Sequence, residues 1–98
     1  MATTPESKVK AKIKAILKEH GAYYAMPIGT GFGNSGVPDF LCCLNGKFLA
    51  IEAKAGKGTT TGLQEKHLRD IEKAGGDAWV VNENNLVHLE EFVKENMK

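Results

Sequence analysis

The chain has 98 residues, of which 42% are hydrophobic and 26% are charged. This is the composition of an ordinary globular domain rather than of a disordered tail, and the length predicts a single domain over residues 1–98 with a thin core. The formal net charge of +1, from 13 Lys and Arg against 12 Asp and Glu, excludes a histone-like basic binder but is compatible with a local basic patch.

The first segment of the chain has the pattern of an amphipathic helix. Thr3 or Thr4 can cap it, Pro5 suits its first turn, and Gly21 can end it after His20. One apolar stripe recurs at helical spacing and consists of Val9, Ile13, Ile16 and Leu17. Lysines cover the remaining surface, and a solvated face explains them more simply than contact with nucleic acid: Lys8, Lys10, Lys12, Lys14 and Lys18.

Three strands are expected next. An apolar, Tyr-containing run predicts a short strand over 22–26, and a glycine-rich loop follows it. Strands at 39–44 and 47–54 are expected to form a hairpin, because Asn45-Gly46 between two apolar runs is the strongest short-range hairpin signal. Both alternating faces of this hairpin are apolar, so we expect helices to cover both faces of the sheet.

The second half of the chain adds two helices and a strand. Helical spacing predicts a helix over 62–74 that ends at Gly75-Gly76, and a buried-type strand is expected over 77–82. A short helix over 88–97 closes the chain. The order αβββαβα predicts an α/β fold with a small central mixed β-sheet flanked by helices.

The hairpin is expected to bring two carboxylates together. With a two-residue turn, Leu44 pairs with Lys47 and Asp39 pairs with Glu52, with Cβ atoms about 5 Å apart. Lys54 lies two residues beyond Glu52 and therefore on the same face. Like charges in this arrangement are unfavourable unless a cation lies between them, and carboxylate oxygens are usual ligands of Mg²⁺.

A second interpretation of these residues stays open. In it, Asp39 lies in the turn after Pro38, and Glu52 and Lys54 belong to a solvated edge. The apolar runs on either side argue against an exposed edge, whereas a one-residue bulge would break the register and favour it.

These residues also resemble a family. Gly36-Val37-Pro38-Asp39, then Ile51-Glu52-Ala53-Lys54 after a hairpin, then Thr61 and Gln64, are similar to the PD-(D/E)xK nuclease pattern. More narrowly, the chain resembles the VRR-NUC (virus-type replication-repair nuclease) domains in the short stand-alone form found in phages. The similarity runs from the first helix through Val81 and implies a restriction-endonuclease-like core.

The resemblance implies a role for each matching residue. Asp39 and Glu52 would bind Mg²⁺ or Mn²⁺ together with the backbone carbonyl of Ala53, Lys54 would position or activate the attacking water, and Gln64 would support the site. The metal would polarise the phosphate and lower the pKa of its water, and the lysine would stabilise hydroxide and the growing negative charge. The resemblance further implies a homodimer that acts on branched DNA, including four-way (Holliday) junctions.

Two of the candidate residues, Gln64 and Glu6, have a structural interpretation as well. Thr61 and Gln64 fit a T-x-x-Q capping box, and the resemblance alone favours an active-site role for Gln64. Glu6 lies seven residues before Ile13, on the apolar stripe, so it is expected to point inwards. Related nucleases supply a glutamate of the first helix to the metal site, but an acid in a first turn also complements the helix dipole. Glu19, at the far end of the helix, is the weaker candidate.

The glycine-rich loop and its surroundings offer weaker candidates. Residues 31–36 satisfy G-x-G-x-x-G, but a strand rather than a helix follows, so no nucleotide cofactor is expected. Asn34 and Ser35 could donate to a DNA phosphate, although a plain connector explains the loop equally well. Lys57, in the loop after Lys54, is a further candidate for a phosphate contact.

The expected function is that of a Mg²⁺- or Mn²⁺-dependent endonuclease that hydrolyses phosphodiester bonds in branched DNA. The alternatives are a less selective nuclease of flaps or single strands, and a DNA-binding module with an idle site.

Adjacent Cys42 and Cys43 predict neither a disulfide nor a zinc knuckle. No segment resembles a signal peptide or a membrane span, so a cytoplasmic location is expected, in the host cytoplasm if a phage encodes the protein.

Overall fold

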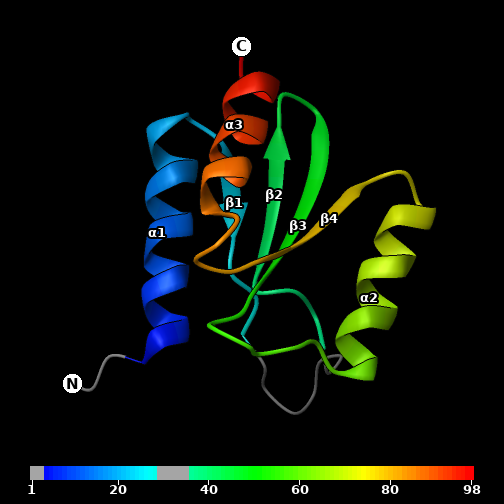
Figure 1. Cartoon of the computed structure of the whole chain (residues 1–98). Coiled ribbons are helices and arrows are strands. Elements are labelled where there is room, and N and C mark those ends of the chain that lie inside the picture. Colours follow the sequence, from blue (N-terminus) through cyan, green and yellow to red (C-terminus); the bar gives the residue numbers. More distant parts are fainter. Residues whose placement is uncertain (1–3, 29–35) are drawn as a thin grey trace.

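A four-stranded mixed sheet organises the part of the chain that the computed structural model describes, residues 4–28 and 36–98 (Figure 1). The strands lie in the order β1-β2-β3-β4, with β1–β2 and β2–β3 antiparallel and β3–β4 parallel. The elements in chain order are α1 (Pro5–Glu19), β1 (Tyr23–Ala25), β2 (Phe40–Leu44), β3 (Lys47–Ala53), α2 (Gly62–Lys73), β4 (Asp77–Val81) and α3 (Leu86–Asn96). The predicted α/β class with a mixed sheet is confirmed.

The ends of the elements follow local sequence signals. Thr4 caps α1, because its hydroxyl oxygen accepts a hydrogen bond from the Ser7 N–H at 3.1 Å, whereas Thr3 lies outside the described residues. The Asn45-Gly46 turn has φ angles of 51° and 90°, the positive values that a type I′ hairpin requires. Leu44 therefore pairs with Lys47 and the hairpin has the predicted register.

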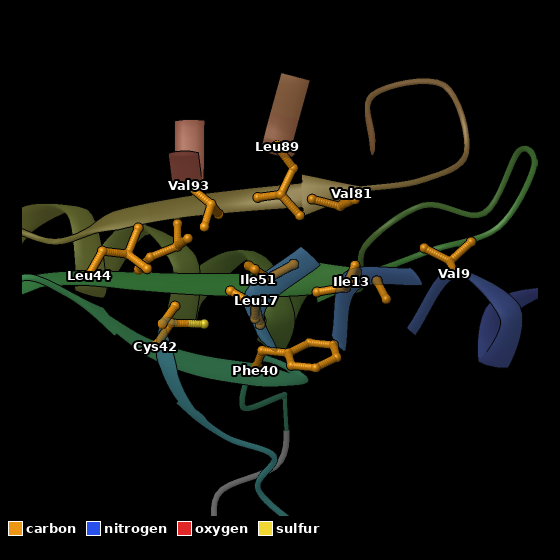
Figure 2. Close-up of a cluster of buried hydrophobic side chains, with 13 residues drawn as sticks. Val9, Ile13, Leu17, Phe40, Cys42, Leu44, Ile51, Val81, Leu89 and Val93 are labelled. Carbon is orange, nitrogen blue, oxygen red and sulfur yellow. The ribbon is translucent and has the colours of Figure 1, made fainter. Parts of the chain in front are cut away.

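Helices α1 and α3 cover one face of the sheet and form the core with it (Figure 2). The stripe on α1 buries Val9, Ile13 and Leu17, and α3 adds Leu89 and Val93. Alternate residues of the strands meet them from the sheet: Phe40, Cys42, Leu44, Leu49, Ile51, Ala53 and Val81. This face supplies the apolar burial that stabilises a domain of this size.

The opposite face of the sheet is only partly covered. Helix α2 lies on this side, against β4 and β3, and none of its residues is buried (Figure 1). A row of directly opposed residues, Tyr23, Cys43 and Phe48, crosses this face from β1 to β3, and all three are exposed. The expectation that helices cover both faces is thus wrong for β1 and β2, whose residues on this face have no helix of the described part of the chain over them. A single helix, α2, is too narrow to cover all four strands.

Some predicted boundaries also differ. Helix α3 begins at Leu86, two residues before the predicted start, because the chain turns at Asn82–Asn85 and the Asn85 carbonyl accepts the His88 N–H at 3.1 Å. Strand β1 is shorter than the run at 22–26. Among the described residues, no helix is long and apolar enough to cross a membrane.

Candidate metal-ion site

The segment before Asp39 packs tightly against the N-terminus of α2. Gly36 has a φ of +83°, and a Cβ atom on it would lie 2.7 Å from the carbonyl carbon of Leu63 and 2.9 Å from the Gln64 nitrogen. Only glycine tolerates both the backbone conformation and this approach. The Gly36-to-Asp39 stretch therefore joins the start of β2 to the start of α2, where the candidate residues gather.

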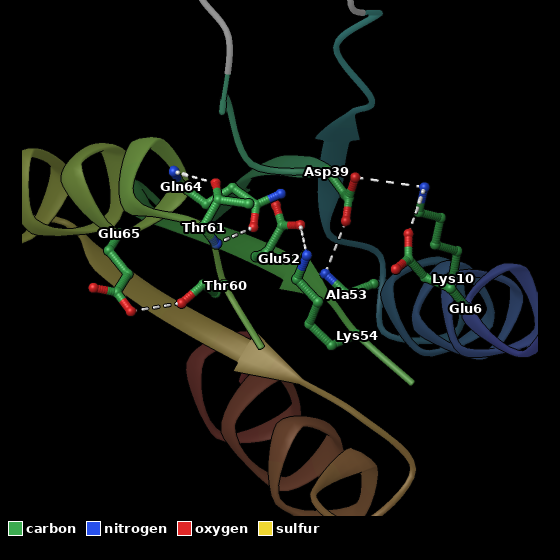
Figure 3. A network of polar contacts seen from close by, with 10 residues as sticks. All are labelled: Glu6, Lys10, Asp39, Glu52, Ala53, Lys54, Thr60, Thr61, Gln64 and Glu65. Atoms are coloured by element: carbon green, nitrogen blue, oxygen red, sulfur yellow. Dashed lines mark hydrogen bonds and ion pairs between the residues drawn. The ribbon is translucent and has the colours of Figure 1, made fainter. Parts of the chain in front are cut away.

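Asp39 is held by a backbone and a side-chain contact (Figure 3). Its Oδ2 accepts a hydrogen bond from the Ala53 N–H at 2.8 Å, so the end of β3 fixes the carboxylate. Its Oδ1 lies 3.5 Å from Nζ of Lys10 on α1. The side chain is 21% exposed, so one side of the carboxylate stays open to solvent.

Among the described residues, Glu52 is the one charged residue that is buried, with 2% of its surface exposed. Its Oε2 lies 3.4 Å from Nζ of Lys54. Its Oε1 is buried and has no hydrogen-bond partner in the described part of the chain. A buried carboxylate oxygen without a partner is costly, since it has lost water and gained nothing in return.

The surroundings of Glu52 disfavour its negative charge. Burial, followed by the negative charge of Asp39, raises the pKa of Glu52 to about 7, although Lys54 acts in the opposite direction. One lysine therefore does not compensate for a buried carboxylate with a second carboxylate beside it. A divalent cation would compensate for both negative charges. Two carboxylates are the hard oxygen donors that Mg²⁺ and Mn²⁺ prefer. These residues fit such an ion.

Lys54 lies where the hairpin register predicts. Its ammonium group is on the same side of β3 as Glu52, and the side chain is 12% exposed. Its backbone N–H donates to the Val81 carbonyl at 2.9 Å, so the β3–β4 pairing extends to this residue and holds it in place. The structure thus brings together Asp39, Glu52 and Lys54.

Gln64 completes the capping box of α2. Its Oε1 accepts the Thr61 N–H at 2.9 Å, and its own N–H donates to the Thr61 hydroxyl oxygen at 3.2 Å. The capping interpretation is therefore confirmed. Figure 3 shows the Gln64 side chain directed to the same side as Glu52. The cap uses the carboxamide oxygen of Gln64. A role for the Gln64 NH₂ group at the site of Asp39 and Glu52 stays a prediction.

The two acids of α1 lie in different surroundings. The Glu6 side chain is 43% exposed, so the expectation that it points inwards is wrong. Glu6 is 3.6 Å from Lys10, which in turn contacts Asp39, so Glu6 is linked to the site through this lysine. Glu19 lies near the other end of the helix, beside His20. The interpretation of the α1 lysines as a solvated face is wrong for Lys10, because its ammonium group contacts Asp39. The spacing of four residues from Glu6 is the signal that marks Lys10 as its helical neighbour.

The remaining candidates lie in loops. Lys57 is exposed in the connection between β3 and α2. One residue before it, the Gly56 N–H donates to Oε1 of Glu83 at 2.7 Å, which anchors this connection. Asn34 and Ser35 lie outside the described residues.

Comparisons of the chain with protein-family models, with curated proteins and with solved structures found no match. The functional interpretation therefore depends on the residues and their geometry.

Proposed function

We propose that the protein is a divalent-metal-dependent DNA endonuclease with a PD-(D/E)xK core of the VRR-NUC type, located in the cytoplasm. The observation that carries this proposal is the buried, unpartnered Oε1 of Glu52, with Asp39 opposite and Lys54 on the same face. Buried charge of this kind destabilises a small domain unless it binds something. A carboxylate such as Glu52, whose pKa is raised by burial and by a specific charged neighbour, is typical of functional sites.

Asp39, Glu52 and the backbone carbonyl of Ala53 would hold the ion. When bound, Mg²⁺ or Mn²⁺ supplies a Lewis acid for the phosphate and lowers the pKa of a bound water. The hydrogen bond from the Ala53 N–H fixes the Asp39 carboxylate at the end of β3. Lys10, with its Nζ 3.5 Å from Oδ1 of Asp39, would lie beside the ion and balance part of the negative charge of the carboxylates.

Lys54 acts on the attacking water. Its ammonium group donates hydrogen bonds to the water, positions it, and stabilises the negative charge that develops on the phosphate oxygens. The position of Lys54 beside Glu52, with little solvent exposure, strengthens this interaction relative to one in open water. Gln64, at the N-terminus of α2, supports the site from the neighbouring element.

We propose branched DNA, including four-way junctions, as the substrate and a homodimer as the active form, on the resemblance to the VRR-NUC domains. A two-fold dimer presents two sites to two strands. The exposed row of Tyr23, Cys43 and Phe48 is apolar surface that a second copy of the chain would cover. The five lysines on α1 make the charge uneven, so a net charge of +1 is compatible with a DNA-facing basic surface.

Cleavage of end-labelled DNA tests the proposal. A four-way junction, a flap and a linear duplex are incubated with Mg²⁺ and the protein, and the products are separated by size. The wild type is expected to cut the junction best. Asp39→Asn and Lys54→Ala are expected to lose at least about a hundredfold in rate, because each removes several kcal/mol of transition-state stabilisation.

Asp70→Asn is the matched control, since Asp70 is an exposed acid that pairs with Lys66 on α2, and it is expected to cut as the wild type does. Binding without cutting in either metal would leave a DNA-binding module and overturn the enzyme. Equal cutting of junction and duplex would overturn the junction preference and leave a general nuclease. Sizing of the protein in solution tests the dimer.

A further inference from the structure

The C-terminal end of α1 carries a second group of metal-ligating side chains. Glu19 and His20 lie at the end of the helix, and Glu90 of α3 meets them from 70 residues further along the chain. With a rise of about 1.5 Å per residue, α1 separates Glu19 from Glu6 by about 20 Å. This group is therefore distinct from the site at Asp39.

The three side chains have nearly the spacing of a tetrahedral site. Nε2 of His20 lies 3.4 Å from Oε2 of Glu90 and 3.7 Å from Oε2 of Glu19. The ligand atoms of all three residues lie within 4.8 Å of one another. With zinc–ligand bonds of about 2.0–2.2 Å, neighbouring ligand atoms in a tetrahedron are about 3.3–3.6 Å apart. The His20–Glu90 distance falls in this range, and the His20–Glu19 distance exceeds it by about 0.1 Å.

The histidine is held while the glutamates are free to adjust. The His20 N–H donates to the Ile16 carbonyl at 3.2 Å, and Gly21 turns the chain away with a φ of +76°. The imidazole is 19% exposed, whereas the side chains of Glu90 and Glu19 are 45% and 66% exposed. An ion can therefore enter from solvent, and the flexible carboxylates can close around it.

We propose that Glu19, His20 and Glu90 bind Zn²⁺, with a fourth coordination position open to water. An imidazole with two carboxylates is a ligand set for Zn²⁺, whereas Mg²⁺ takes oxygen ligands and usually keeps several waters. The ion joins the end of α1 to α3, the two helices that cover the buried face of the sheet. Its effect is to stabilise this helix pair, independently of any cutting of DNA.

Metal titration tests the site directly. The chain used as the parent carries Glu52→Gln, so that the Asp39 site contributes little to metal binding. This parent is titrated with Zn²⁺ by calorimetry and with Co²⁺ by visible absorption. One Zn²⁺ per chain and the intense bands of tetrahedral Co²⁺ are expected. His20→Ala should weaken Zn²⁺ binding at least about tenfold, since changes even beyond the direct ligands have effects of this size.

His88→Ala is the matched control, because His88 is an exposed histidine on α3, and it should bind Zn²⁺ as the parent does. Circular dichroism reports whether His20→Ala folds. If it does not fold, Glu90→Gln tests the site instead, because it keeps the shape of the side chain. Zn²⁺ should raise the melting temperature of the parent and of His88→Ala but not of Glu90→Gln. Absence of Zn²⁺ binding by the parent, or binding that Glu90→Gln leaves unchanged, would reduce the group to ion pairs and overturn the proposal.

Discussion

The two faces of the sheet differ in what they bury. Toward α1 and α3, Phe40 and Ile51 are completely buried among apolar side chains (Figure 2). Toward α2, Tyr23 and Phe48 are 73% and 43% exposed, and Glu52 is buried with an unpaired oxygen. One face therefore provides the stability of the domain, and the candidate chemistry lies on the other, part of which is open to solvent.

A pair of phenylalanines on the two faces tests this difference most strongly. Phe40→Ala empties a completely buried position and should lower the free energy of unfolding by about 3–5 kcal/mol. Phe48→Ala, on the half-open face, should lower it by about 1 kcal/mol, since much of its side chain is already in water. Urea unfolding of both variants measures the two values. Similar losses would show that the faces do not differ as described.

Glu52 should make the stability of the protein depend on pH. Because its pKa rises from 4.5 to about 7 on folding, the folded chain binds more protons than the unfolded chain between these values. The free energy of unfolding therefore falls as pH rises from about 4.5 to about 7. Glu52→Gln stays neutral, so it should be more stable than the wild type at pH 8, by at most about 3 kcal/mol, and nearly equal to it at pH 4.

Urea unfolding without metal at these two pH values measures the effect. Glu91→Gln, an exposed acid on α3, is the control and should follow the wild type at both. A Glu52→Gln variant that is less stable than the wild type at pH 8 would mean that Lys54 compensates fully for the buried carboxylate.

Gly36 should matter for both stability and the site. Gly36→Ala strains a backbone at φ +83° and brings a methyl group to 2.7 Å from Leu63, so we expect a loss of about 1–3 kcal/mol and slower DNA cutting as Asp39 shifts. Gly46→Ala is the control: its φ of +90° adds similar strain, but nothing lies within 4 Å of the new methyl group. It should lower stability without changing the rate per folded molecule. Equal rates for both variants would contradict the packing argument.

The smallest expected effect concerns the cap of α2. Thr61→Ala removes the hydroxyl that accepts the Gln64 N–H and should lower the free energy of unfolding by about 1 kcal/mol. Gln64→Ala should lose a similar amount of stability and, in addition, cut DNA more slowly. If the two variants cut equally well, Gln64 is a capping residue only.

The hairpin shows how much of the site could be predicted from the sequence. Asn45-Gly46 fixes a two-residue turn, the turn fixes the register, and the register places Glu52 next to the start of β2, where Asp39 lies. Alternation along β3 then puts Lys54 on the same face. Each step is local or spans fewer than twenty residues, and the structure confirms the register and the proximity.

Longer-range features could not be predicted in this way. Periodicity shows that α2 has one apolar side, but not which strands it covers, so the exposure of Tyr23 and Phe48 was missed. The contact of Lys10 with Asp39 depends on how α1 crosses the end of the sheet. The approach of Glu90 to His20 joins residues 70 positions apart, and nothing in the spacing of either segment indicates it.

The central claim is that the buried carboxylate of Glu52 binds the metal ion with which the protein cuts DNA. The most direct measurement is the initial rate of cutting of a labelled four-way junction at pH 8, as Mg²⁺ is titrated into the wild type and into Glu52→Gln. We predict a rate that saturates with Mg²⁺ for the wild type and no cutting by the folded variant at any Mg²⁺ concentration. A Glu52→Gln variant that cuts with the rate and the Mg²⁺ dependence of the wild type would contradict the account.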